Sequence, residues 1–549
     1  MDRGETEQKK LKIVYAGYDL FLVCLKRLAE CCDILYLFTF PGDDYDSSEQ
    51  ITAFAAEQGI PCSDRRLSAE KLLELEELGA DYMIVAGYIW KIPVSERIRQ
   101  INIHPAYLPM GRGPWPMPVA LMRGLDSGVT FHRLVEELDE GDILLQRKIS
   151  FDSSDDLELL TAKIRRAALE LLEAFLEDPD TCWEQAVSQD TLIRRRCLEE
   201  PLYWKEPSEE EYTIHAFDTP EVVERKMKAF RGFGVRYCYE GLRLIVEEGY
   251  PDQEGVLIPT VMQPDFREIR LSDRETCETL RRRYPALLSD YTFSLVYSWR
   301  KQLDIRVYQD EDLMVFRIGD RYLFPLGSEE KVHRFIDSMI RLQMPLYFGF
   351  CDENQKEWLE RAYPGLFSIE CPEKDRDYRI SIRDLLELPG GKRISRRKDA
   401  HHFAHLDPPP VWERIDQDNL PVAAALSLEA NGPDLTAEQE AIRHFFELGL
   451  KGTLVKRGDR YIGFSIVSDQ NEHTLQGHFL KCLDRERGGY LYMMQTCAKA
   501  FGTDNGYMNL EDDMGYEGLR RFKMSLKPEI VLSYNADTSF PEVLPGSPV

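Results

Sequence analysis

Three polar residues of this chain have the types that acyl transfer to an amine requires. Asn102 and His104 stand in Asn102-Ile103-His104-Pro105, and Asp139 follows 35 residues after His104. Alternate residues of an extended strand share a face, so we expect Asn102 and His104 to point into one cleft. The amide can donate to an oxygen that becomes an oxyanion, the imidazole can take the proton of an amine, and the carboxylate can balance the imidazolium. The spacing therefore predicts a formyl or acyl transferase.

The order of these residues carries the prediction, rather than any one of them. A single histidine at a strand end is usually a polar residue with an ordinary partner, and a single aspartate before glycine usually forms a turn. His132, on a strand expected over residues 129–134, either faces the substrate or caps a buried pair. It is therefore a secondary candidate.

The same segment resembles the 10-formyltetrahydrofolate-dependent formyltransferases, the family of methionyl-tRNA formyltransferase, glycinamide ribonucleotide transformylase and the sugar-nucleotide N-formyltransferases. The motifs that carry the resemblance are Asn102 to Pro105, Leu108-Pro109 with Arg112-Gly113, Gly128-Val129-Thr130, and Asp139 to Leu144. Ala106 stands where many members carry serine, which alters the loop and leaves the three polar residues in place.

The resemblance implies site residues and a cofactor. Asn102, His104 and Asp139 would be catalytic, and 10-formyltetrahydrofolate would be the formyl donor, with its pterin near residues 85–92 and 138–141. The implied substrate-binding or cofactor-binding residues are Gly87, Tyr88, Ile89, Arg112, Gly113, Thr130, His132, Gly141 and Asp142.

The elements that must position these residues alternate between strand and helix. Apolar runs predict strands over 11–16, 34–38 and 82–87, and helical spacing predicts helices over 20–31, 49–58, 69–78 and 157–176. This alternation is typical of an α/β fold whose open, mainly parallel, Rossmann-like sheet is covered by helices on both faces. Such sheets place their sites at the carboxyl ends of the strands, where Asn102 and His104 are expected.

Composition indicates a folded protein of several domains. The 549 residues are 43% hydrophobic, and the net charge of −27 with a pI near 4.9 disfavours a broad grip on nucleic acid or an anionic membrane. The 12 cysteines include no Cys-x-x-Cys and no Cys/His cluster with zinc spacing, so we expect reduced thiols, a cytoplasmic chain and no metal site. The charged amino terminus, residues 1–10, lacks the apolar core of a signal peptide, and no apolar run approaches the length of a membrane span.

Changes in character along the chain suggest four domains. We expect a formyltransferase catalytic domain over 1–195, a small domain over 196–258, and two further domains over 259–378 and 379–549. In the small domain a helix over 220–230 precedes a strand pair over 234–239 and 242–247. Its Ile214-His215-Ala216-Phe217 segment resembles the domain that follows many formyltransferase cores, and an ordinary linker domain is the equal alternative.

The last 280 or so residues resemble the carboxyl-terminal family of phosphatidylglycerol lysyltransferases, which implies an α+β tandem of acetyltransferase-like domains. The motifs are Ser289 to Phe293, Tyr297 to Arg300, Arg396 to Asp399, and Asn509 to Arg520 with Lys523 and Ser525. Leu510 replaces an arginine and Asp399 an asparagine of that family, and its membrane-spanning part is absent, so lipid lysylation is not expected.

Candidate residues for a second site lie in these motifs: Arg396, Lys398, Glu511, Asp512, Asp513, Arg520 and Lys523. The three acids either hold a cationic amine such as an aminoacyl group or supply the acidic bias of a helix start. The basic run that includes Arg396 and Lys398 either grips a phosphate or forms a solvated helix face. Acyl-CoA and aminoacyl-tRNA are the candidate donors, although the loop over 485–490 lacks the last glycine of a coenzyme-A pyrophosphate loop.

Together these observations predict a bifunctional transferase that formylates the primary amine of a small molecule and carries a second acyl or aminoacyl transferase. The alternatives are a formyltetrahydrofolate hydrolase, a methionyl-tRNA formyltransferase, and a formyltransferase whose carboxyl-terminal part binds a tRNA or peptide without chemistry. The sequence identifies neither the acceptor amine nor the oligomeric state.

Overall fold

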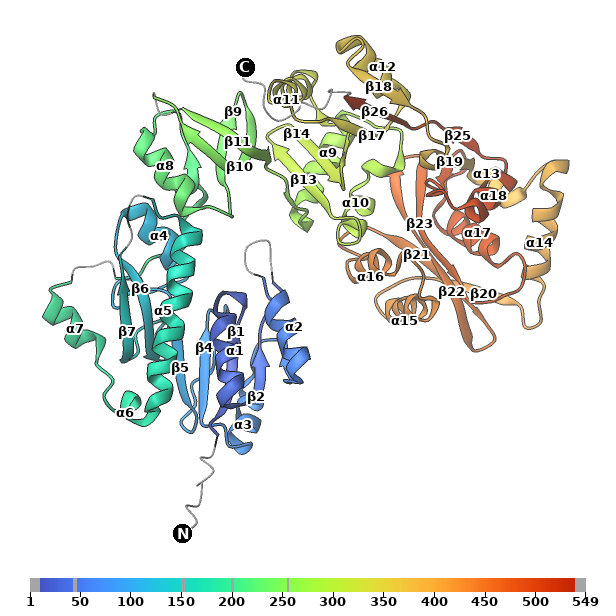
Figure 1. The fold of residues 1–549 in the computed structure, drawn as a ribbon. Coiled ribbons are helices and arrows are strands. Elements are labelled where there is room, and N and C mark those ends of the chain that lie inside the picture. The colour runs from blue at the N-terminus through green and yellow to red at the C-terminus, as the bar shows by residue number, and fades with distance from the viewer. Residues whose placement is uncertain are drawn as a thin grey trace. The chain divides into compact units, whose positions relative to one another are not determined.

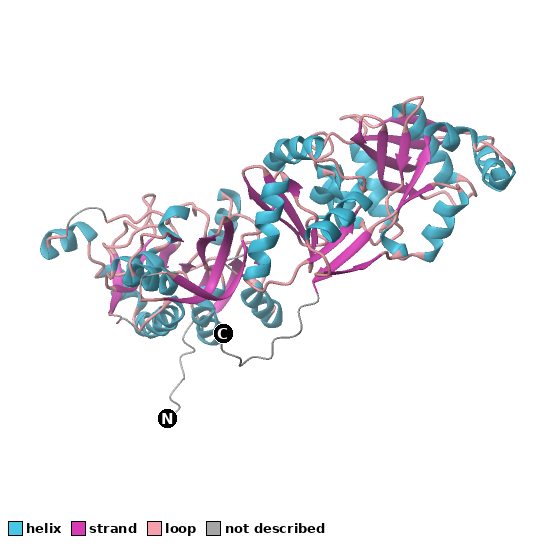
Figure 2. Cartoon of the chain, turned by 90° about the horizontal axis from the view of Figure 1, so that it is seen from above, coloured by secondary structure: helices cyan, strands magenta, loops and turns pink. Residues whose placement is uncertain are grey.

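The computed structural model describes residues 10–42, 47–150, 152, 154–198, 202–253 and 256–538, so most of the amino terminus discussed above lies outside it. The chain divides into two compact units (Figure 1). Unit 1 comprises Met1–Cys238 with Arg243–Gln263, and unit 2 comprises Tyr239–Leu242 with Pro264–Val549. Helices pack around the strands in both units (Figure 2).

Unit 1 contains a seven-stranded sheet in the order β3-β2-β1-β4-β5-β6-β7. The first five strands are parallel: β1 (Lys12–Gly17), β2 (Asp33–Phe38), β3 (Cys62–Ser63), β4 (Tyr82–Ala86) and β5 (Arg99–His104). Strands β6 (Ser127–Arg133) and β7 (Ile143–Ile149) add to this sheet in antiparallel pairs. The mainly parallel α/β sheet predicted from the sequence is confirmed.

Helices accompany this sheet along the chain. The helices α1 (Leu22–Cys31), α2 (Glu49–Gln58), α3 (Ala69–Glu77), α4 (Pro116–Arg123) and α5 (Leu157–Glu177) have buried apolar residues, whereas α6 (Pro179–Glu184) and α7 (Gln189–Arg196) have none. The long helix α5 begins where the Asp156 carboxylate accepts the backbone N–H of Leu159 at 2.9 Å, and its buried face includes Leu160, Ile164 and Leu172.

A smaller sheet follows in the order β11-β10-β9-β8. It consists of β8 (Thr213–Ile214), β9 (Val235–Tyr239), β10 (Leu242–Pro251) and β11 (Leu257–Pro264), with helix α8 (Pro220–Ala229) between β8 and β9. The turn from β9 to β10, between the two strands expected from the sequence, passes through Glu240 and Gly241, both with positive φ.

The first sheet of unit 2 has eight strands: β12 (Arg267–Glu268), β13 (Ile305–Asp310), β14 (Leu313–Ile318), β15 (Arg321–Leu323), β16 (Leu326–Gly327), β17 (Tyr347–Cys351), β18 (Phe367–Glu370) and β26 (Tyr534–Thr538). Its helices are α9 (Arg274–Arg283), α10 (Phe293–Trp299), α11 (Glu329–Arg341) and α12 (Glu353–Ala362). Strand β26 pairs with both β17 and β18, so a late segment of the chain completes this early sheet.

The second sheet of unit 2 runs in the order β20-β21-β22-β23-β24-β19-β25. Its strands are β19 (Asp377–Ser381), β20 (Pro410–Arg414), β21 (Lys451–Arg457), β22 (Arg460–Asn471), β23 (Thr474–Cys482), β24 (Tyr507–Asn509) and β25 (Glu529–Val531). The helices here are α13 (Ile382–Glu387), α14 (Ile394–Ala404), α15 (Leu420–Ala430), α16 (Leu435–Arg443), α17 (Gly489–Phe501) and α18 (Glu517–Ser525). The two sheets agree with the α+β character predicted for this part.

Candidate functional site

Strand pairing brings two histidines, an asparagine and a threonine together at the end of β5. Asn102 and His104 are separated by one residue and share a face of β5. In the antiparallel register with β6, Asn102 lies opposite His132 and His104 lies opposite Thr130. His132, a secondary candidate in the sequence, is therefore a direct neighbour of Asn102.

The loop between β6 and β7 places Asp139 beside these residues at the end of β5. Asp139 has a φ of 58°, a conformation that few residues other than glycine adopt. At Gly141 an added Cβ would lie only 1.8 Å from the Arg133 carbonyl oxygen, so the loop closes on β6 through a position that admits no side chain. The buried Gln189 amide donates to the carbonyl oxygens of Asp139 at 2.7 Å and Gly141 at 2.8 Å.

The Asp139 carboxylate is the centre of the cluster. Its Oδ1 accepts the Asn102 amide at 3.0 Å and lies 3.7 Å from His104 Nδ1 and 3.5 Å from His132 Nε2, while Oδ2 accepts the Gly113 N–H at 3.0 Å. Burial alone would raise the pKa of Asp139, but His104, His132 and the Gly113 N–H outweigh it and hold the pKa well below its usual range. Asp139 is therefore a carboxylate at neutral pH.

His104 is buried, and burial lowers its pKa below the ordinary value even though Asp139 and the Gly111 carbonyl act in the opposite direction. Its Nε2 donates to the Gly111 carbonyl oxygen at 2.7 Å. Because a neutral imidazole carries one proton, Nδ1 then holds the lone pair and faces Asp139.

Asn102 links Asp139 to His132. One amide hydrogen is directed to Asp139, and the same nitrogen lies 3.2 Å from His132 Nε2. His132 Nδ1 donates to the Arg133 carbonyl oxygen at 2.8 Å, so its Nε2 accepts from Asn102. Both amide hydrogens of Asn102 are thus engaged inside the cluster.

The loop after β5 is fixed by residues that the sequence assigned to binding. Thr130 Oγ1 donates to the Ala106 carbonyl oxygen at 2.7 Å and accepts the Leu108 N–H at 3.2 Å. The buried Arg112 donates to Gln189 Oε1 at 2.9 and 3.1 Å and pairs with Glu140 at 2.9 Å. Both therefore hold the loops on either side of the cluster.

Gln189 was not anticipated from the sequence. It lies 50 residues after Asp139, at the start of α7, and joins the Asp139 loop to Arg112. No local motif marks it, because its role arises only when α7 packs against the two loops.

The segment after β4 was assigned to the pterin. The Tyr88 hydroxyl accepts the Leu67 N–H at 3.3 Å, and Tyr88 packs against a buried cluster that includes Ile92 and also receives Leu134. The loops after β4 and β6 therefore pack on the same buried apolar cluster. Ile89 on the first loop and Leu138 on the second leave 54% and 58% of their surface exposed.

Two more residues that the resemblance implied in binding, Gly87 and Asp142, lie in this region. Gly87 has a φ of 78°, and an added Cβ would lie 2.4 Å from the Tyr18 ring. Asp142, implied in binding, lies 3.4 Å from Arg133 Nη1.

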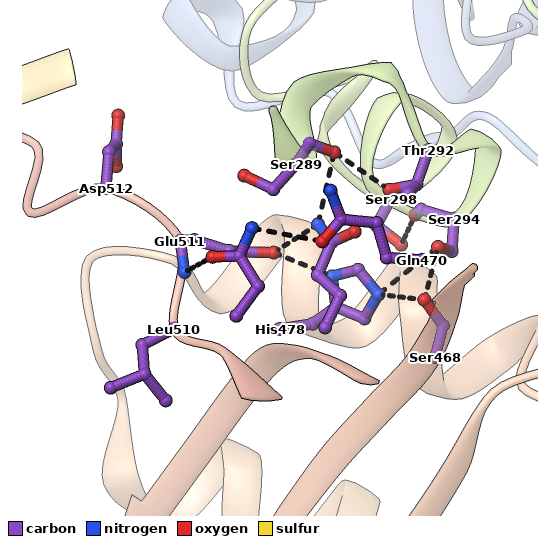
Figure 3. A network of polar contacts seen from close by, with 12 residues as sticks. Ser289, Thr292, Ser294, Ser298, Ser468, Gln470, His478, Leu510, Glu511 and Asp512 are labelled. Carbon is purple, nitrogen blue, oxygen red and sulfur yellow. Dashed lines mark hydrogen bonds and ion pairs between the residues drawn. The ribbon is translucent and has the colours of Figure 1, made fainter. Parts of the chain in front are cut away.

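In unit 2, Glu511 takes part in a polar network (Figure 3). Its Oε1 accepts the Gln476 amide at 2.7 Å and the His478 Nδ1–H at 2.9 Å. His478 and Gln476 lie on β23 and were not anticipated from the sequence, because no motif connects them to Glu511.

The neighbouring acids have different partners. Asp513 accepts from Arg520 Nε at 2.7 Å and from the Tyr378 hydroxyl at 2.5 Å, and these bonds lower its pKa although burial opposes them. Burial, with the nearby Asp377 charge, raises the pKa of Asp512 to about 7. Asp513 therefore has partners of its own, whereas Asp512 and Glu511 lie near each other and near the buried Asp377.

Lys523 and the basic run are also held within the unit. Lys523 is buried, which lowers its pKa, and its Nζ donates to the carbonyl oxygens of Leu510, Asp512 and Glu511. Arg396 donates to Ser525 Oγ at 2.7 Å, whereas Lys398 is exposed. Within the described part of the chain, Arg396 and Lys398 do not converge on one point.

Two family models match the chain. Residues 41–176 match the formyl transferase family, and residues 281–537 match the carboxyl-terminal domain of phosphatidylglycerol lysyltransferase. The chain is similar to methionyl-tRNA formyltransferase of Listeria innocua, with 32% identity over 214 residues that span 36% of this chain and 69% of that protein. The corresponding enzyme of Ehrlichia ruminantium is 31% identical over 185 residues, 32% of this chain and 57% of that protein.

Solved structures also align with the chain. A conserved protein of unknown function from Bacteroides thetaiotaomicron has a TM-score of 0.47 and 24% identity, covering 50% of this chain and 99% of that one. A sugar N-formyltransferase from Shewanella has a TM-score of 0.34 and 14% identity, covering 47% and 99%. HypX from Aquifex aeolicus in complex with tetrahydrofolic acid has a TM-score of 0.33 and 16% identity, covering 60% and 48%.

The match of residues 41–176 places unit 1 among the group transferases. The chain belongs to the formyl transferase family and carries a second part similar to the phosphatidylglycerol lysyltransferase carboxyl-terminal domain. Among the helices that the structure describes, none combines the length and apolar character needed to cross a bilayer. The described residues also contain no group of three or more His, Cys, Asp or Glu residues arranged to hold a metal.

Proposed function

We propose that unit 1 transfers a formyl group from 10-formyltetrahydrofolate to the primary amine of a small molecule. The observation that carries the proposal is one buried cluster in which Asp139 contacts Asn102, His104 and His132. The family uses this folate, and a neutral imidazole beside a fixed carboxylate is suited to accept the proton of an amine.

The residues around the cluster fit a folate. The exposed side chains of Ile89 and Leu138 lie on two loops that pack on the same buried apolar cluster. Such apolar side chains suit contact with one face of a pterin. Bound there, 10-formyltetrahydrofolate supplies the formyl group that the amine receives. Gly87 and Gly141, which admit no side chain, keep the backbone of both loops close to this surface.

In this proposal His104 takes the proton of the amine at Nδ1 as the new C–N bond forms, and gives it to the donor nitrogen when the bond from that nitrogen to the formyl carbon breaks. The imidazolium that forms is stabilised on both sides, because Nε2–H donates to Gly111 and Nδ1–H faces the Asp139 carboxylate. Asp139 keeps its negative charge throughout because its pKa is well below the usual range.

Asn102 is proposed as the donor to the carbonyl oxygen. It would exchange its 3.2 Å contact with His132 for the substrate oxygen and keep its bond to Asp139. His132 is then the residue that holds the Asn102 amide ready, which explains why it lies beside the cluster.

A small acceptor is supported by charge. The chain carries a formal charge of −27, which opposes the broad phosphate contacts that a tRNA requires. Methionyl-tRNA is the main competing acceptor because relatives of the chain formylate it.

The test is turnover with a pool of acceptors. The full-length protein is incubated with 10-formyltetrahydrofolate and amino sugars, nucleotide sugars, amino acids or methionyl-tRNA, and folate release is followed with the mass of each acceptor. We expect a small amine to gain one formyl group. We expect His104→Ala to reduce the rate by about 1,000-fold with an unchanged melting temperature, because the base is lost.

Matched controls separate the alternatives. His215→Ala removes another histidine of unit 1, one that contacts Glu210, and should leave turnover unchanged. Release of formate without an acceptor would replace the proposal with a hydrolase, and turnover with methionyl-tRNA alone would replace the small acceptor. Full activity of His104→Ala would refute the site.

We further propose that unit 2 transfers an acyl or aminoacyl group. The match of residues 281–537 to a lysyltransferase domain supports this class, and the bond from His478 to Glu511 supplies a polarised imidazole within those residues. A module that binds a tRNA or peptide without chemistry is the competing class, and loss of Glu511 would leave such binding intact.

A further inference from the structure

Two buried serines, Ser294 and Ser468, are among the residues that line a cavity in unit 2. The cavity has a volume of about 910 Å³ and is lined by residues of α9, α10 and β22, including Arg274, Glu278, Arg281, Ser294 and Ser468. This volume is sufficient for a drug-sized molecule.

An imidazole lies behind the serines. His478 Nε2 is 2.8 Å from Ser468 Oγ and 3.2 Å from Ser294 Oγ, and the two hydroxyl oxygens are 2.9 Å apart (Figure 3). Because Nδ1 donates to Glu511, Nε2 of the neutral ring holds a lone pair. The shorter contact makes Ser468 the donor to His478, and Ser294 can then donate to Ser468.

The backbone directs His478 toward the serines. The pairing of β22 with β23 shifts between Ile466 and Val467, whose partners are Phe479 and Gly477, so His478 is the extra residue of a β-bulge. Bulges redirect a side chain and are common beside active sites. His478 would otherwise follow the regular alternation of the strand.

Glu511 is equally fixed. It adopts a φ of 58°, its N–H donates to Asn509 Oδ1 at 2.9 Å, and its carboxylate accepts from Gln476 as well as from His478. An acidic residue held in a left-handed conformation by several bonds is typical of positions kept for function.

We propose that Ser468, His478 and Glu511 form a nucleophilic relay through which unit 2 transfers acyl groups by way of an acyl-serine. This rests on the acyl-transfer role proposed above and adds a covalent intermediate to it. The relay brings together three segments of the chain, with hydroxyl, imidazole and carboxylate in the order that acyl transfer requires.

The atoms of the reaction balance without an added oxidant or reductant. Ser468 Oγ attacks the carbonyl carbon of an ester and passes its proton to His478 Nε2. The bond to the alcohol oxygen breaks, and that oxygen takes the proton from Nε2. An amine then attacks the acyl-serine, its proton returns through His478 to Ser468 Oγ, and an amide leaves.

The cavity indicates the class of ester. Guanidinium groups of Arg274, Arg281 and Arg282 line it together with carboxylates of Glu275, Glu278, Asp469 and Glu472. Groups of both signs suit a small ester that carries an ammonium group and an anionic group rather than a purely apolar lipid.

The test uses the full-length protein and an alkyl fluorophosphonate, which phosphonylates activated serines. We expect one adduct by intact mass, located on Ser468 after digestion. Ser468→Ala should form no adduct. His478→Gln should slow labelling by about 100-fold, because the proton acceptor is lost.

A matched control and a second measurement keep the proposal open to refutation. Ser465→Ala removes a buried serine of the same strand whose hydroxyl has no hydrogen-bond partner among the described residues, and labelling should be unchanged. With 4-nitrophenyl acetate, Glu511→Gln should lower kcat by about 10-fold without raising KM, and Glu511→Asp should recover part of the loss, as a positioning residue would.

Two results would overturn the relay. One is a folded wild-type protein in which Ser468 is not labelled, and the other is an adduct that persists in Ser468→Ala. Transfer of an acyl group by a protein whose Ser468→Ala variant is fully active would reject the acyl-serine and leave the wider proposal for unit 2 intact.

Discussion

At the scale of single residues, burial favours the neutral form of both His104 and Asp139, but the two side chains end in different charge states. It lowers the pKa of His104 and keeps the ring neutral, whereas three neighbouring groups overcome its effect on Asp139 and keep that side chain charged. A free base beside a permanent negative charge results. In unit 2, His478 and Glu511 likewise share a hydrogen bond of 2.9 Å.

The pH dependence of formyl transfer follows from these directions. The reaction needs neutral His104, whose pKa is lowered from 6.5, so kcat/KM should stay constant from pH 7 upward and fall only well below pH 6.5. A pH–rate profile measures this. Asp139→Asn removes the charge that raises the pKa of His104, so the fall in kcat/KM on the acid side should begin at a lower pH. The value of kcat should fall about 100-fold. A fall in kcat/KM that began above pH 6.5 would contradict the role of neutral His104 as the base.

Asp512 gives a prediction about stability. Its folded pKa of about 7 exceeds the ordinary 3.8, so the stability that comes from its protonation is complete at low pH and is lost as pH rises through 7. The free energy of unfolding of Asp512→Asn relative to wild type should therefore increase by about 1–2 kcal/mol when the pH is raised from 5.5 to 8. Urea unfolding at both pH values measures this difference. The exposed Asp504→Asn is the control and should show no such trend. If the substitution changed the free energy of unfolding equally at both pH values, the raised pKa of Asp512 would be refuted.

At the scale of elements, two irregularities place the reacting groups. The β6–β7 loop turns through Asp139 and closes at Gly141, and the β22–β23 bulge turns His478 toward the serines. Regular strands alone would position neither side chain, because they alternate strictly between faces. The bulge and the loop are therefore as much part of the sites as the residues they carry.

Gly141→Ala tests the closure of this loop. Its Cβ would lie 1.8 Å from the Arg133 carbonyl oxygen, so the loop must move, and Asp139 with it. We expect formyl transfer to fall about 100-fold or more and unit 1 to lose about 1–3 kcal/mol. The control is Gly124→Ala, a left-handed glycine with nothing within 4 Å of an added Cβ, which should cost about 1 kcal/mol and leave kcat unchanged. Equal kinetics for both variants would separate the loop from catalysis.

At the scale of the whole molecule, each proposed site draws its residues from one unit. The formyl transfer cluster lies within residues 87–189, and the serine relay lies within residues 294–511. Strand β26 ties residues 534–538 to the sheet that begins at β12, so unit 2 folds around residues from both of its ends.

The two activities should therefore be separable in the intact chain. His104→Ala should abolish formyl transfer and leave fluorophosphonate labelling of Ser468 within about twofold, and Ser468→Ala should do the reverse, since the two sites share no residue. Both assays on both variants measure this. Loss of both activities in either variant would show that the sites are coupled.

Local sequence patterns predict most elements of the unit 1 sheet and two residues of its polar cluster. The period of apolar residues fixed α2 over 49–58 and located β1, β2, β4 and α5 to within a residue or two, because each pattern records which face of an element is buried. The Asn-x-His motif predicted a shared face because strand geometry is local. The position of Asp139 followed from the family resemblance.

Contacts between segments far apart in the chain are visible only once the elements pack. Gln189 meets Asp139 across 50 residues, and Ser468, His478 and Glu511 meet through a bulge, a neighbouring strand and a distant loop. The different hydrogen-bond partners of Glu511 and Asp513, and the raised pKa of Asp512, likewise depend on what packs against each residue, although the three are consecutive in sequence. Sequence spacing specifies which residues share an element, whereas burial, pKa and contacts between distant segments arise only when those elements pack.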